Sequence, residues 1–394
     1  MNLTWTPEQL ARRETYRTFG RNAVAPGAAD RDASGDFHRA AWKELAASQF
    51  WLFHVSTDLG GHGGTLWDFL ANLEGLAAGA EDSGFVLSAV AHAGLIHVLS
   101  EHGTPEQQHR IIPALTGGAL GATAATEPQG GSHVAAVATI ATPAAHGGWT
   151  LTGHKSHITN APAADHLLIV GRMPELGKRD ITLFVVERGR AGLSTGEHEN
   201  LLGQRTSPTG PIHLQDVAVT RDDIVGRPGN GLATLYSFLA FDRLMYGVVV
   251  AAQLEAALPG AIARITERHA FGSPLAEHQM IQDKLVTART TIESSRHLAY
   301  AAADSLIRGD DRFSVLASCA KLSASEGGVQ SALELMQIFG HSGYERTQPH
   351  ERRLRDAVAI RIAGGTTEMQ KKNIFKDTAE RFACASTGEQ EGTP

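Results

Sequence analysis

The chain has 394 residues, of which 42% are hydrophobic and 20% are charged, as is typical of a soluble globular protein of two or three domains. Its formal net charge of -7, with no basic block to offset it, argues against a nucleic-acid binder. The two cysteines, Cys319 and Cys384, are too few for a disulfide framework and predict a reducing, cytoplasmic location. No run of 18 apolar residues occurs and the charged N-terminus lacks an apolar segment, so we expect neither a membrane span nor a secretory signal.

Residues 1–120 predict a helical N-terminal domain. Thr6-Pro7-Glu8 combines a capping residue with a proline in the first turn, and Thr104-Pro105-Glu106 repeats this pattern at the last helix of the region. The glycines of 60–64 mark a loop between helices. The nearly all-apolar stretch 85–101 predicts a helix that is buried on most sides.

Residues 121–229 predict a small, mostly antiparallel β domain. Glycine, threonine and short β-type runs replace the helical periodicity of the preceding region. The strand-like segments, each bounded by turn residues, are 149–152, 165–170, 181–186 and 212–219.

Residues 230–385 predict a C-terminal helical bundle. Apolar residues between 235 and 249 recur at helical spacing and predict a long helix that reaches Arg268, with a local interruption at Pro259-Gly260. Further helices are expected at 274–308, 312–339, 350–362 and 368–384, before a disordered polar tail at 386–394. A helical, a β and a second helical region in this order predict an α+β fold.

Common catalytic signatures are missing from the chain. It contains no G-x-x-x-x-G-K-[ST], G-x-G-x-x-G, H-E-x-x-H or G-x-S-x-G. The 19 histidines show no ligand spacing, so we expect scattered surface and core histidines and no metal site.

The stretch 337–376, QIFGHSGYERTQPHERRLRDAVAIRIAGGTTEMQKKNIFK, contains two glycine turns and two helix starts. Glycines let backbone N–H groups approach a ligand, and a helix that starts at such a turn can bind an anion, although two helices joined by an ordinary turn look the same. The stretch closely resembles the C-terminal signature of the acyl-CoA dehydrogenase family, flavoenzymes that desaturate acyl thioesters. The resemblance covers nearly the whole chain and implies a helical domain, a β domain and a four-helix bundle.

Two segments of the β domain resemble the parts of this family that face the flavin of FAD. ATEPQGGS at 125–132 resembles the loop that bonds the flavin edge, although in isolation it is a glycine loop at a domain edge. HKSHITN at 154–160 resembles the second flavin strand, with a histidine where the family usually has an aromatic residue. The cofactor residues that the resemblance implies here are Thr126, Gly131, Ser132, His157 and Thr159, with Ser132 also near the substrate.

The segment RHAFGSPLAEHQ at 268–279 resembles the family's Arg-x-x-Phe-Gly motif, which binds the ADP part of an FAD held mainly by a neighbouring subunit. An arginine fork suits pyrophosphate, although a surface arginine beside a core phenylalanine has the same pattern. The family also meets the cofactor at both glycine turns of 337–376. The cofactor residues implied by these segments are Arg268, Phe271, Gln279, Gln337, Gly340, Thr366 and Glu368. Because such a site is shared between subunits, the resemblance implies a homotetramer.

The usual catalytic carboxylate of the family is missing. The family reaction removes an α-proton from the acyl group while flavin N5 takes a β-hydride. Most members carry the base as the glutamate just before Gly-Thr in the last turn, and this position is occupied here by Gly364, after Ala363 where an aromatic residue is usual. We therefore expect open space beside the flavin and contacts of Ala363 and Gly364 with an unusual substrate.

Asp242, which precedes Arg243 on the long helix, is the candidate catalytic base because a minority of the family carry the base there. Asp242 also lies on the apolar stripe of this helix, where a carboxylate is unfavourable unless it is paired or functional. The alternative is a structural ion pair with Arg268 or another arginine. We also expect Arg243 to contact the substrate. The apolar neighbours at helical spacing are Phe238, Leu239, Met245 and Tyr246.

Together these features predict an FAD-dependent dehydrogenase that desaturates an acyl thioester, carried on CoA or an acyl carrier protein, in a specialised biosynthetic pathway. Its expected electron acceptor is a flavoprotein or O₂, and neither nucleic acid nor a membrane is an expected partner. Two alternatives are a flavin-dependent monooxygenase on the same fold, against which Asp242 argues, and a non-catalytic flavin-binding subunit.

Overall fold

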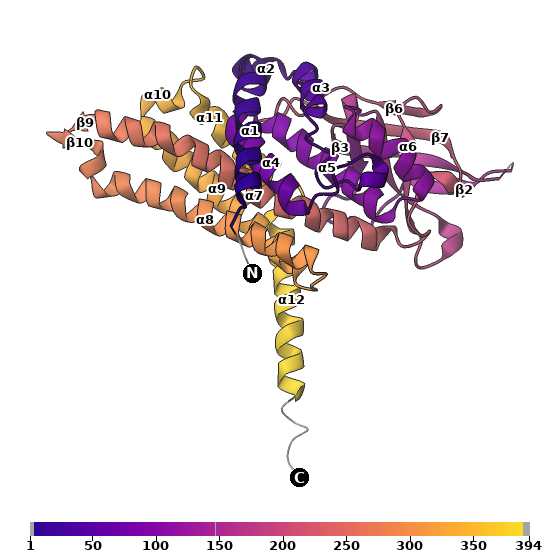
Figure 1. The fold of residues 1–394 in the computed structure, drawn as a ribbon. Helices are drawn as coiled ribbons and strands as arrows, with labels where there is room; N and C mark the ends of the chain where they lie inside the picture. Colours follow the sequence, from indigo (N-terminus) through magenta and orange to yellow (C-terminus); the bar gives the residue numbers. More distant parts are fainter. Residues whose placement is uncertain (1–3, 146, 389–394) are drawn as a thin grey trace, which may run out of the picture.

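The computed structural model describes residues 4–145 and 147–388, and its regions follow the expected order: helices, a sheet, then helices again (Figure 1). Two of the N-terminal helices begin at capping residues. The Thr6 hydroxyl accepts from the Gln9 amide at 3.3 Å, and Thr104 and Gln107 form the same reciprocal cap. The helices of this region are α1 (Pro7–Phe19), η1 (Gly20–Val24), α2 (Ala28–Ser34), α3 (Arg39–Ala47), η2 (Thr57–Leu59), α4 (Leu66–Gly79), α5 (Ser83–His102) and α6 (Pro105–Thr116).

The middle region forms an eight-stranded sheet in the order β6-β7-β3-β2-β4-β5-β8, with β1 paired to β4. Most pairs are antiparallel, as predicted, whereas β1 and β2 each run parallel to β4. Four strands were not predicted because segments of two to four residues are too short to show an alternating pattern. The strands are β1 (Gly121–Ala124), β2 (Ile140–Pro143), β3 (Trp149–Thr159), β4 (His166–Arg172), β5 (Ile181–Glu187), β6 (Leu193–Thr195), β7 (Thr209–Val219) and β8 (Ile224–Val225), with short helical turns η3 (Ala161–Ala163), η4 (Pro174–Leu176) and η5 (Arg221–Asp223).

The C-terminal region is built on three long helices that pack against one another. The predicted long helix is 37 residues long and continues through Pro259. The final helix starts against α9 and then projects from the body of the molecule (Figure 1). It continues to residue 388, two residues past the predicted start of the disordered tail at 386, and residues 389–394 lie outside the described residues. The elements are α7 (Gly231–Glu267), β9 (His269–Ala270), β10 (Ser273–Pro274), η6 (Leu275–Glu277), α8 (Gln279–Ile307), α9 (Phe313–Phe339), α10 (His341–Tyr344), α11 (Pro349–Ile360) and α12 (Thr367–Gly388).

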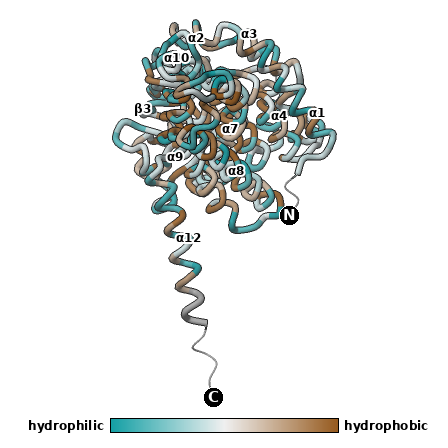
Figure 2. Tube along the Cα trace, turned by 90° about the vertical axis from the view of Figure 1, so that its left-hand side faces the viewer, coloured by the Kyte–Doolittle hydropathy of each residue, from teal (hydrophilic) through white to brown (hydrophobic). Residues whose placement is uncertain are grey.

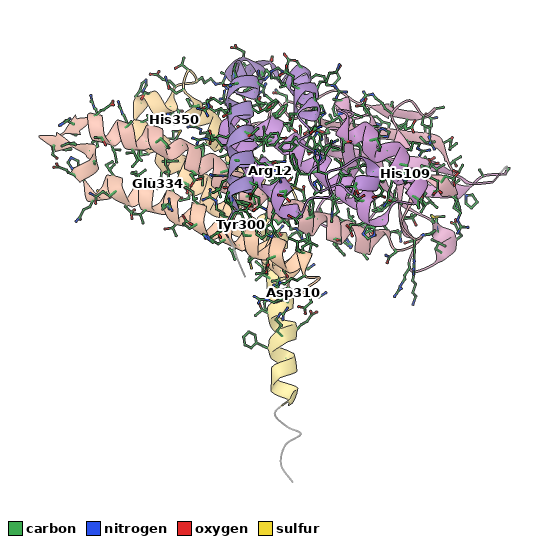
Figure 3. All side chains as sticks on the ribbon, in the orientation of Figure 1. Arg12, His109, Tyr300, Asp310, Glu334 and His350 are labelled. Carbon is green, nitrogen blue, oxygen red and sulfur yellow. The ribbon has the colours of Figure 1, made fainter. Side chains whose placement is uncertain are left out.

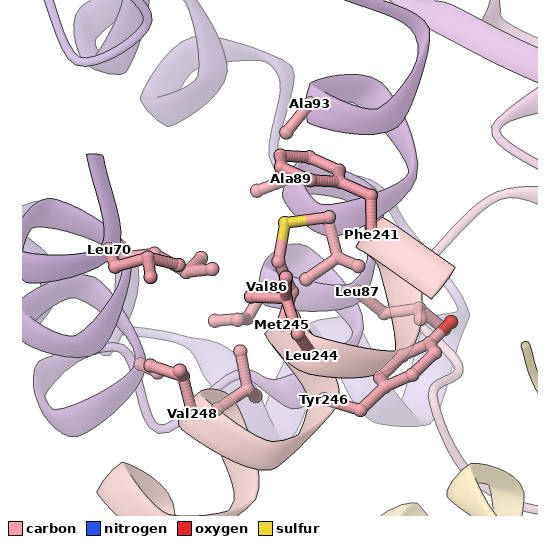
Figure 4. Close-up of a cluster of buried hydrophobic side chains, with 14 of the residues drawn as sticks. Leu70, Val86, Leu87, Ala89, Ala93, Phe241, Leu244, Met245, Tyr246 and Val248 are labelled. Carbon is pink, nitrogen blue, oxygen red and sulfur yellow. The ribbon is translucent and has the colours of Figure 1, made fainter. Parts of the chain in front are cut away.

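The main hydrophobic core lies where α4 and α5 meet α7. Figure 2 shows hydrophobic residues concentrated in the body of the molecule, and Figure 4 shows side chains of these helices in contact. By length and composition alone, α5 and α7 could each cross a membrane, but 78% of the α5 window and 50% of the α7 window are buried inside the fold. A buried core helix can be as long and as apolar as a membrane-spanning helix, so length and composition do not distinguish the two.

A buried ionic network joins the N-terminal helices to the bundle. Glu74 of α4, which is 1% exposed, lies 3.0 Å from Arg13 of α1 and 3.2 Å from Arg296 of α8. The hydroxyl of Tyr300, which is labelled in Figure 3, donates to the same carboxylate. With two cations and a hydroxyl around it, the Glu74 charge is compensated inside the fold.

Glycines allow α1 and α4 to pack with their backbones in contact. A Cβ atom at Gly75 would lie 2.1 Å from the carbonyl oxygen of Arg13, and one at Gly79 would lie 2.0 Å from that of Arg17. Neither backbone oxygen can move without displacing its helix. The close packing of α1 on α4 therefore requires glycine at positions 75 and 79.

Gly79→Ala should lower the free energy of unfolding by about 1–3 kcal/mol, because the added methyl group forces α1 away from α4. Gly260→Ala in α7 is the matched control. A Cβ there meets no atom within 4 Å, so this change should raise stability by about 0.5–1 kcal/mol through helix propensity. Urea denaturation measures both, and equal effects of the two changes would contradict the close helix contact.

Candidate active site

A cavity of about 980 Å³ lies between the sheet, α5, α7 and the turn that precedes α12. Its walls bring together predicted site residues that are far apart in the sequence. One wall comes from the loop after β1 and the end of β3, another from α7, and a third from the turn at 363–366. The predicted residues that line the cavity are Thr126, Gly131, Ser132, His157, Thr159, Asp242, Arg243, Ala363, Gly364 and Thr366.

Among the residues that the structure describes, no ion-pair partner of the buried Asp242 carboxylate is found. It is 5% exposed, and its Oδ1 atom has no hydrogen-bond partner among the described residues. Burial raises the pKa of Asp242 to about 6, while the hydrogen bond from Tyr246 and the charges of Arg243 and Lys321 act in the opposite direction. An acid with this pKa is largely ionised at neutral pH and can accept a proton.

The alternative of an ion pair between Asp242 and Arg268 is wrong. Arg268 follows the last residue of α7, so at about 1.5 Å per residue it lies roughly 40 Å along the helix from Asp242. Within residues 4–145 and 147–388, no salt bridge to Asp242 occurs through any other arginine. The helix therefore directs an uncompensated carboxylate into the cavity, as the apolar stripe predicted.

The turn from Gly364 to Thr366 is held by three buried side chains. Arg243 Nε donates to the Gly364 carbonyl at 3.1 Å, and Lys321 Nζ of α9 donates to the Gly365 carbonyl at 2.7 Å. The side-chain amide of Gln370 also donates to Gly365, at 2.7 Å. Arg243, predicted to contact the substrate, thus has a structural contact with the turn, and its substrate contact stays a prediction.

The carbonyl groups of the turn are hydrogen-bonded inside the fold, whereas its backbone amides, within the described ranges, are not. The N–H groups of Gly364, Gly365 and Thr366 donate to no other group in the described part of the chain. Gly364 and Gly365 have φ angles of +64° and +89°, a backbone conformation that favours glycine. Consecutive free amides beside a carboxylate can stabilise negative charge on a carbonyl oxygen.

The open space expected beside Gly364 is not present, because Tyr246 fills it. A Cβ atom at Gly364 would lie 2.6 Å from Tyr246 Cε2 and 3.3 Å from Asp242 Oδ2. Tyr246 is 4% exposed and one helical turn after Asp242. The sequence placed Tyr246 on the apolar stripe, but nothing in it indicated the contact with the distant turn.

The loop at 125–132 is anchored by a buried ion pair. Glu127, which is 3% exposed, lies 2.6 Å from Nζ of the fully buried Lys155 and accepts from the Thr139 amide at 3.0 Å and its hydroxyl at 2.6 Å. Burial lowers the pKa of Lys155 to about 8, against the effect of Glu127. Sequence reasoning missed this anchor, although a glutamate inside a glycine loop was a possible signal of it.

The cavity lining suits a flavin nucleotide. Two buried polar atoms on its walls, Thr123 Oγ1 and Gln204 Oε1, have no partner among the described residues. A Cβ at Gly131 would meet only the Thr126 methyl carbon, at 3.9 Å, so the loop leaves room for a ligand. The hydroxyl-bearing residues Thr126, Ser132 and Thr159 on one wall and apolar side chains of α5 and α7 on another fit the polar edge and apolar faces of an isoalloxazine.

His157 has a different environment from that of an aromatic residue packed on a ring. It is at the cavity edge with a φ of 56°, its side chain is 69% exposed, and its Nδ1 lies 2.9 Å from Glu199. This pair links β3 to the loop before β7. Whether the imidazole covers the flavin stays a prediction.

A second group of predicted cofactor residues lies away from this cavity. Arg268, Phe271 and Gln279 are exposed around the β9–β10 hairpin, and Phe271 is 100% exposed. Gln337 and Gly340 are exposed at the end of α9, and Glu368 is near the cavity mouth without lining it. Their separation agrees with the expectation that they serve another subunit, and the tetramer stays a prediction. No cluster of three or more metal-ligating side chains occurs in the described ranges.

Glu127→Ala should destabilise the protein by roughly 3–5 kcal/mol, because it leaves the buried Lys155 charge unpaired, and should also weaken flavin retention. Glu187→Ala on β5 is the matched control. Its ion pair with Arg110 spans 3.9 Å with both side chains about half exposed, so its loss should change stability by less than about 0.5 kcal/mol. Thermal unfolding and bound-flavin absorbance measure both effects. Equal losses of stability and flavin in the two variants would show that the Glu127–Lys155 pair contributes no more than an exposed ion pair.

Three family models match the chain in order. The N-terminal, middle and C-terminal domain models of acyl-CoA dehydrogenase match residues 6–119, 122–217 and 229–378. An acyl-CoA dehydrogenase of Bacillus subtilis is 32% identical over 373 residues, covering 94% of this chain and 98% of the relative. The mitochondrial isovaleryl-CoA dehydrogenase of Oryza sativa is 32% identical over 385 residues, covering 94% and 92% of the two chains.

Solved structures agree with the sequence relatives. The prolyl acyl carrier protein oxidase AnaB is 28% identical with a TM-score of 0.91, covering 95% of this chain and 100% of AnaB. Butyryl-CoA dehydrogenase from Megasphaera elsdenii is 30% identical with a TM-score of 0.91, covering 96% and 100%. PigA, solved with FAD and proline, is 26% identical with a TM-score of 0.91, covering 97% and 100%. The chain therefore belongs to the acyl-CoA dehydrogenase family of oxidoreductases that act on CH–CH bonds.

Proposed function

We propose that this chain desaturates a compact acyl group, carried as a thioester, with Asp242 as the base that removes the α-proton. The single observation that carries this proposal is the unpaired, buried Asp242 carboxylate in the wall of the cavity. The cofactor is FAD, as family membership and the FAD complex of PigA indicate.

Different residues of the chain have different roles in the proposed reaction. FAD, when bound, supplies the acceptor for the β-hydride. Asp242 takes the α-proton onto its carboxylate, and the free amides of Gly364 and Gly365 are the donors available to a thioester oxygen. Arg243 and Lys321 hold those amides in place through the carbonyl groups of the turn. Thr126, Ser132 and Thr159 offer hydroxyl groups from the sheet side.

A compact acyl group is supported by the bulky side chains at the α5–α7 wall. Phe238, Leu239 and Tyr246 line the cavity from α7. The Phe238 ring packs so closely on α5 that a Cβ at Gly94 would lie 2.2 Å from its Cε2 atom. Among the structural relatives, AnaB is a prolyl acyl carrier protein oxidase, and PigA was solved with FAD and proline. Prolyl groups, proline and butyryl groups are all small.

Both CoA and an acyl carrier protein are supported as the carrier, because the relatives include enzymes of CoA thioesters and an oxidase of a carrier-bound prolyl group. Both carriers present a phosphopantetheine thioester, so one site can serve either. We propose a specialised biosynthetic substrate and a flavoprotein or O₂ as the electron acceptor. Anaerobic mixing with prolyl-carrier protein, butyryl-CoA and isovaleryl-CoA distinguishes the carriers, because only an accepted thioester reduces the flavin. Absence of reduction by every thioester, with hydroxylation in air, would favour a monooxygenase.

Asp242→Asn should keep the fold and the flavin but slow flavin reduction by substrate by about 10²–10⁴-fold, since the change removes only the proton-accepting oxygen. Stopped-flow absorbance under anaerobic conditions measures the rate. Asp311→Asn, at an exposed carboxylate that also lines the cavity, is the matched control and should leave the rate within twofold or so. Unchanged reduction in the Asp242 variant would refute the assigned base.

Flavin reduction should become faster as pH rises through about 6, because Asp242 must be ionised to accept the proton and its pKa is raised to about 6. Between pH 5 and 7.5 the rate should increase roughly tenfold. A rate that is flat or falls over this range would contradict the prediction.

The same shift has the opposite effect on stability. Because the pKa of Asp242 is higher in the folded protein than its ordinary value of 3.8, stability is lost as pH rises from about 4 to about 6. The loss is on the order of 3 kcal/mol. Asp242→Asn should therefore stabilise the protein more at pH 8 than at pH 4 in thermal unfolding.

A further inference from the structure

Tyr246 is the one described tyrosine that contacts both Asp242 and the Gly364 turn. In the cavity wall, its ring and the Asp242 Oδ2 atom lie 2.6 Å and 3.3 Å from the Cβ position of Gly364, and its hydroxyl group lowers the pKa of Asp242. Figure 4 shows Tyr246 at the edge of the apolar cluster, on the side away from Leu70, with its hydroxyl oxygen turned away from the apolar side chains. Burial beside Asp242 raises the pKa of Tyr246 well above its ordinary value, so the hydroxyl group remains a proton donor at working pH.

The ring of Tyr246 and the missing side chain of Gly364 fit each other. A Cβ at position 364 would lie 2.6 Å from Tyr246 Cε2 and 3.3 Å from its Cδ2. Contacts below 3.0 Å require a shift, and a ring that is 4% exposed in a helix has little freedom to move. The ring can therefore reach its position beside Asp242 only when residue 364 is glycine.

We propose that Tyr246 is a positioning residue for Asp242: its ring occupies the space of a side chain at position 364, and its hydroxyl group orients the carboxylate toward the cavity. This inference rests on the proposed role of Asp242 as base. An aspartate has one rotatable bond fewer than a glutamate and a shorter reach, so its direction depends strongly on its neighbours. Of the two carboxylate oxygens, Oδ1 is buried without a partner among the described residues, whereas Oδ2 faces the Gly364 turn, 3.3 Å from the place of a Cβ at that residue.

Other charged groups also face this site and must stay constant in a test. Arg243 neighbours Asp242 on α7, and Lys321 approaches from α9. The α12 wall of the cavity carries Lys372, Lys376, Asp377 and Glu380. Tyr246→Phe leaves all of these charges in place and removes only a neutral hydroxyl group.

Tyr246→Phe should move the pH midpoint of flavin reduction upward, because the lost hydrogen bond favoured the ionised form of Asp242. We expect a shift of about one pH unit, which makes reduction roughly tenfold slower at low pH, equivalent to about 1.4 kcal/mol. Tyr300→Phe is the matched control. It removes another buried tyrosine hydroxyl bonded to a carboxylate, Glu74, outside the cavity, and should lower stability without moving the midpoint.

Two outcomes separate this inference from the proposed function. If Asp242→Asn still supports flavin reduction, the proposed base is wrong. If Asp242→Asn abolishes reduction and Tyr246→Phe has the midpoint of the parent protein, only the positioning role is wrong. A readout without substrate gives an independent result. The loss of thermal stability between pH 4 and pH 8 should be larger in Tyr246→Phe than in the parent, and the addition of Asp242→Asn should remove the difference.

The steric pairing has its own test. Gly364→Ala should displace the Tyr246 ring and slow flavin reduction. In a Tyr246→Ala background, the same change should slow flavin reduction less. Gly365→Ala is the matched control, because its φ of +89° imposes similar strain while its Cβ would meet Gln370 at 3.1 Å and not Tyr246. Its effect should be the same in both backgrounds. If Gly364→Ala also slows flavin reduction equally in both backgrounds, the proposed steric fit between Gly364 and Tyr246 is wrong.

Discussion

The position of the Gly364–Thr366 turn is the constraint on which the site depends. Its carbonyl groups accept hydrogen bonds from Arg243, Lys321 and Gln370, which belong to three different helices. Because these donors are buried, a hydrogen bond lost from any one of them is not readily replaced by water. The turn therefore joins α7, α9 and α12 at one point, with Asp242 next to it. Cavity shape, carboxylate environment and amide donors all follow from this one junction.

Buried charges in this protein fall into two kinds. Glu74 and Glu127 each have cationic partners and several hydrogen bonds, so they hold elements together. Asp242 has no ion pair and its Oδ1 has no partner within the described ranges, so burial raises its pKa. A fold that gives Glu74 and Glu127 cationic partners and leaves Asp242 without one among the described residues, in the wall of a cavity, sacrifices stability at that position. Such a sacrifice is typical of a group that must exchange a proton.

The spatial arrangement also separates the features of the family into two places. The cavity gathers residues from the sheet, α7 and the turn, whereas Arg268 and Phe271 lie exposed on the hairpin beyond the far end of the same helix. A helix of 37 residues spans roughly 55 Å, so one molecule cannot bring both of its ends to one flavin nucleotide. Exposure of a phenylalanine at a hairpin tip is unfavourable in an isolated chain and agrees with contact to a further copy.

The sequence by itself determined the helical and β regions, the helix caps at Thr6 and Thr104, and the inward direction of Asp242. These features arise from rules that act within four residues, such as capping and the apolar stripe. Only the tertiary structure decided that Tyr246 fills the space beside Gly364, that Glu127 pairs with Lys155, and that strands of two to four residues complete the sheet. Each of these depends on side-chain volume or charge brought together from distant parts of the chain. No local pattern records such contacts, because they exist only after the helices and the sheet have packed.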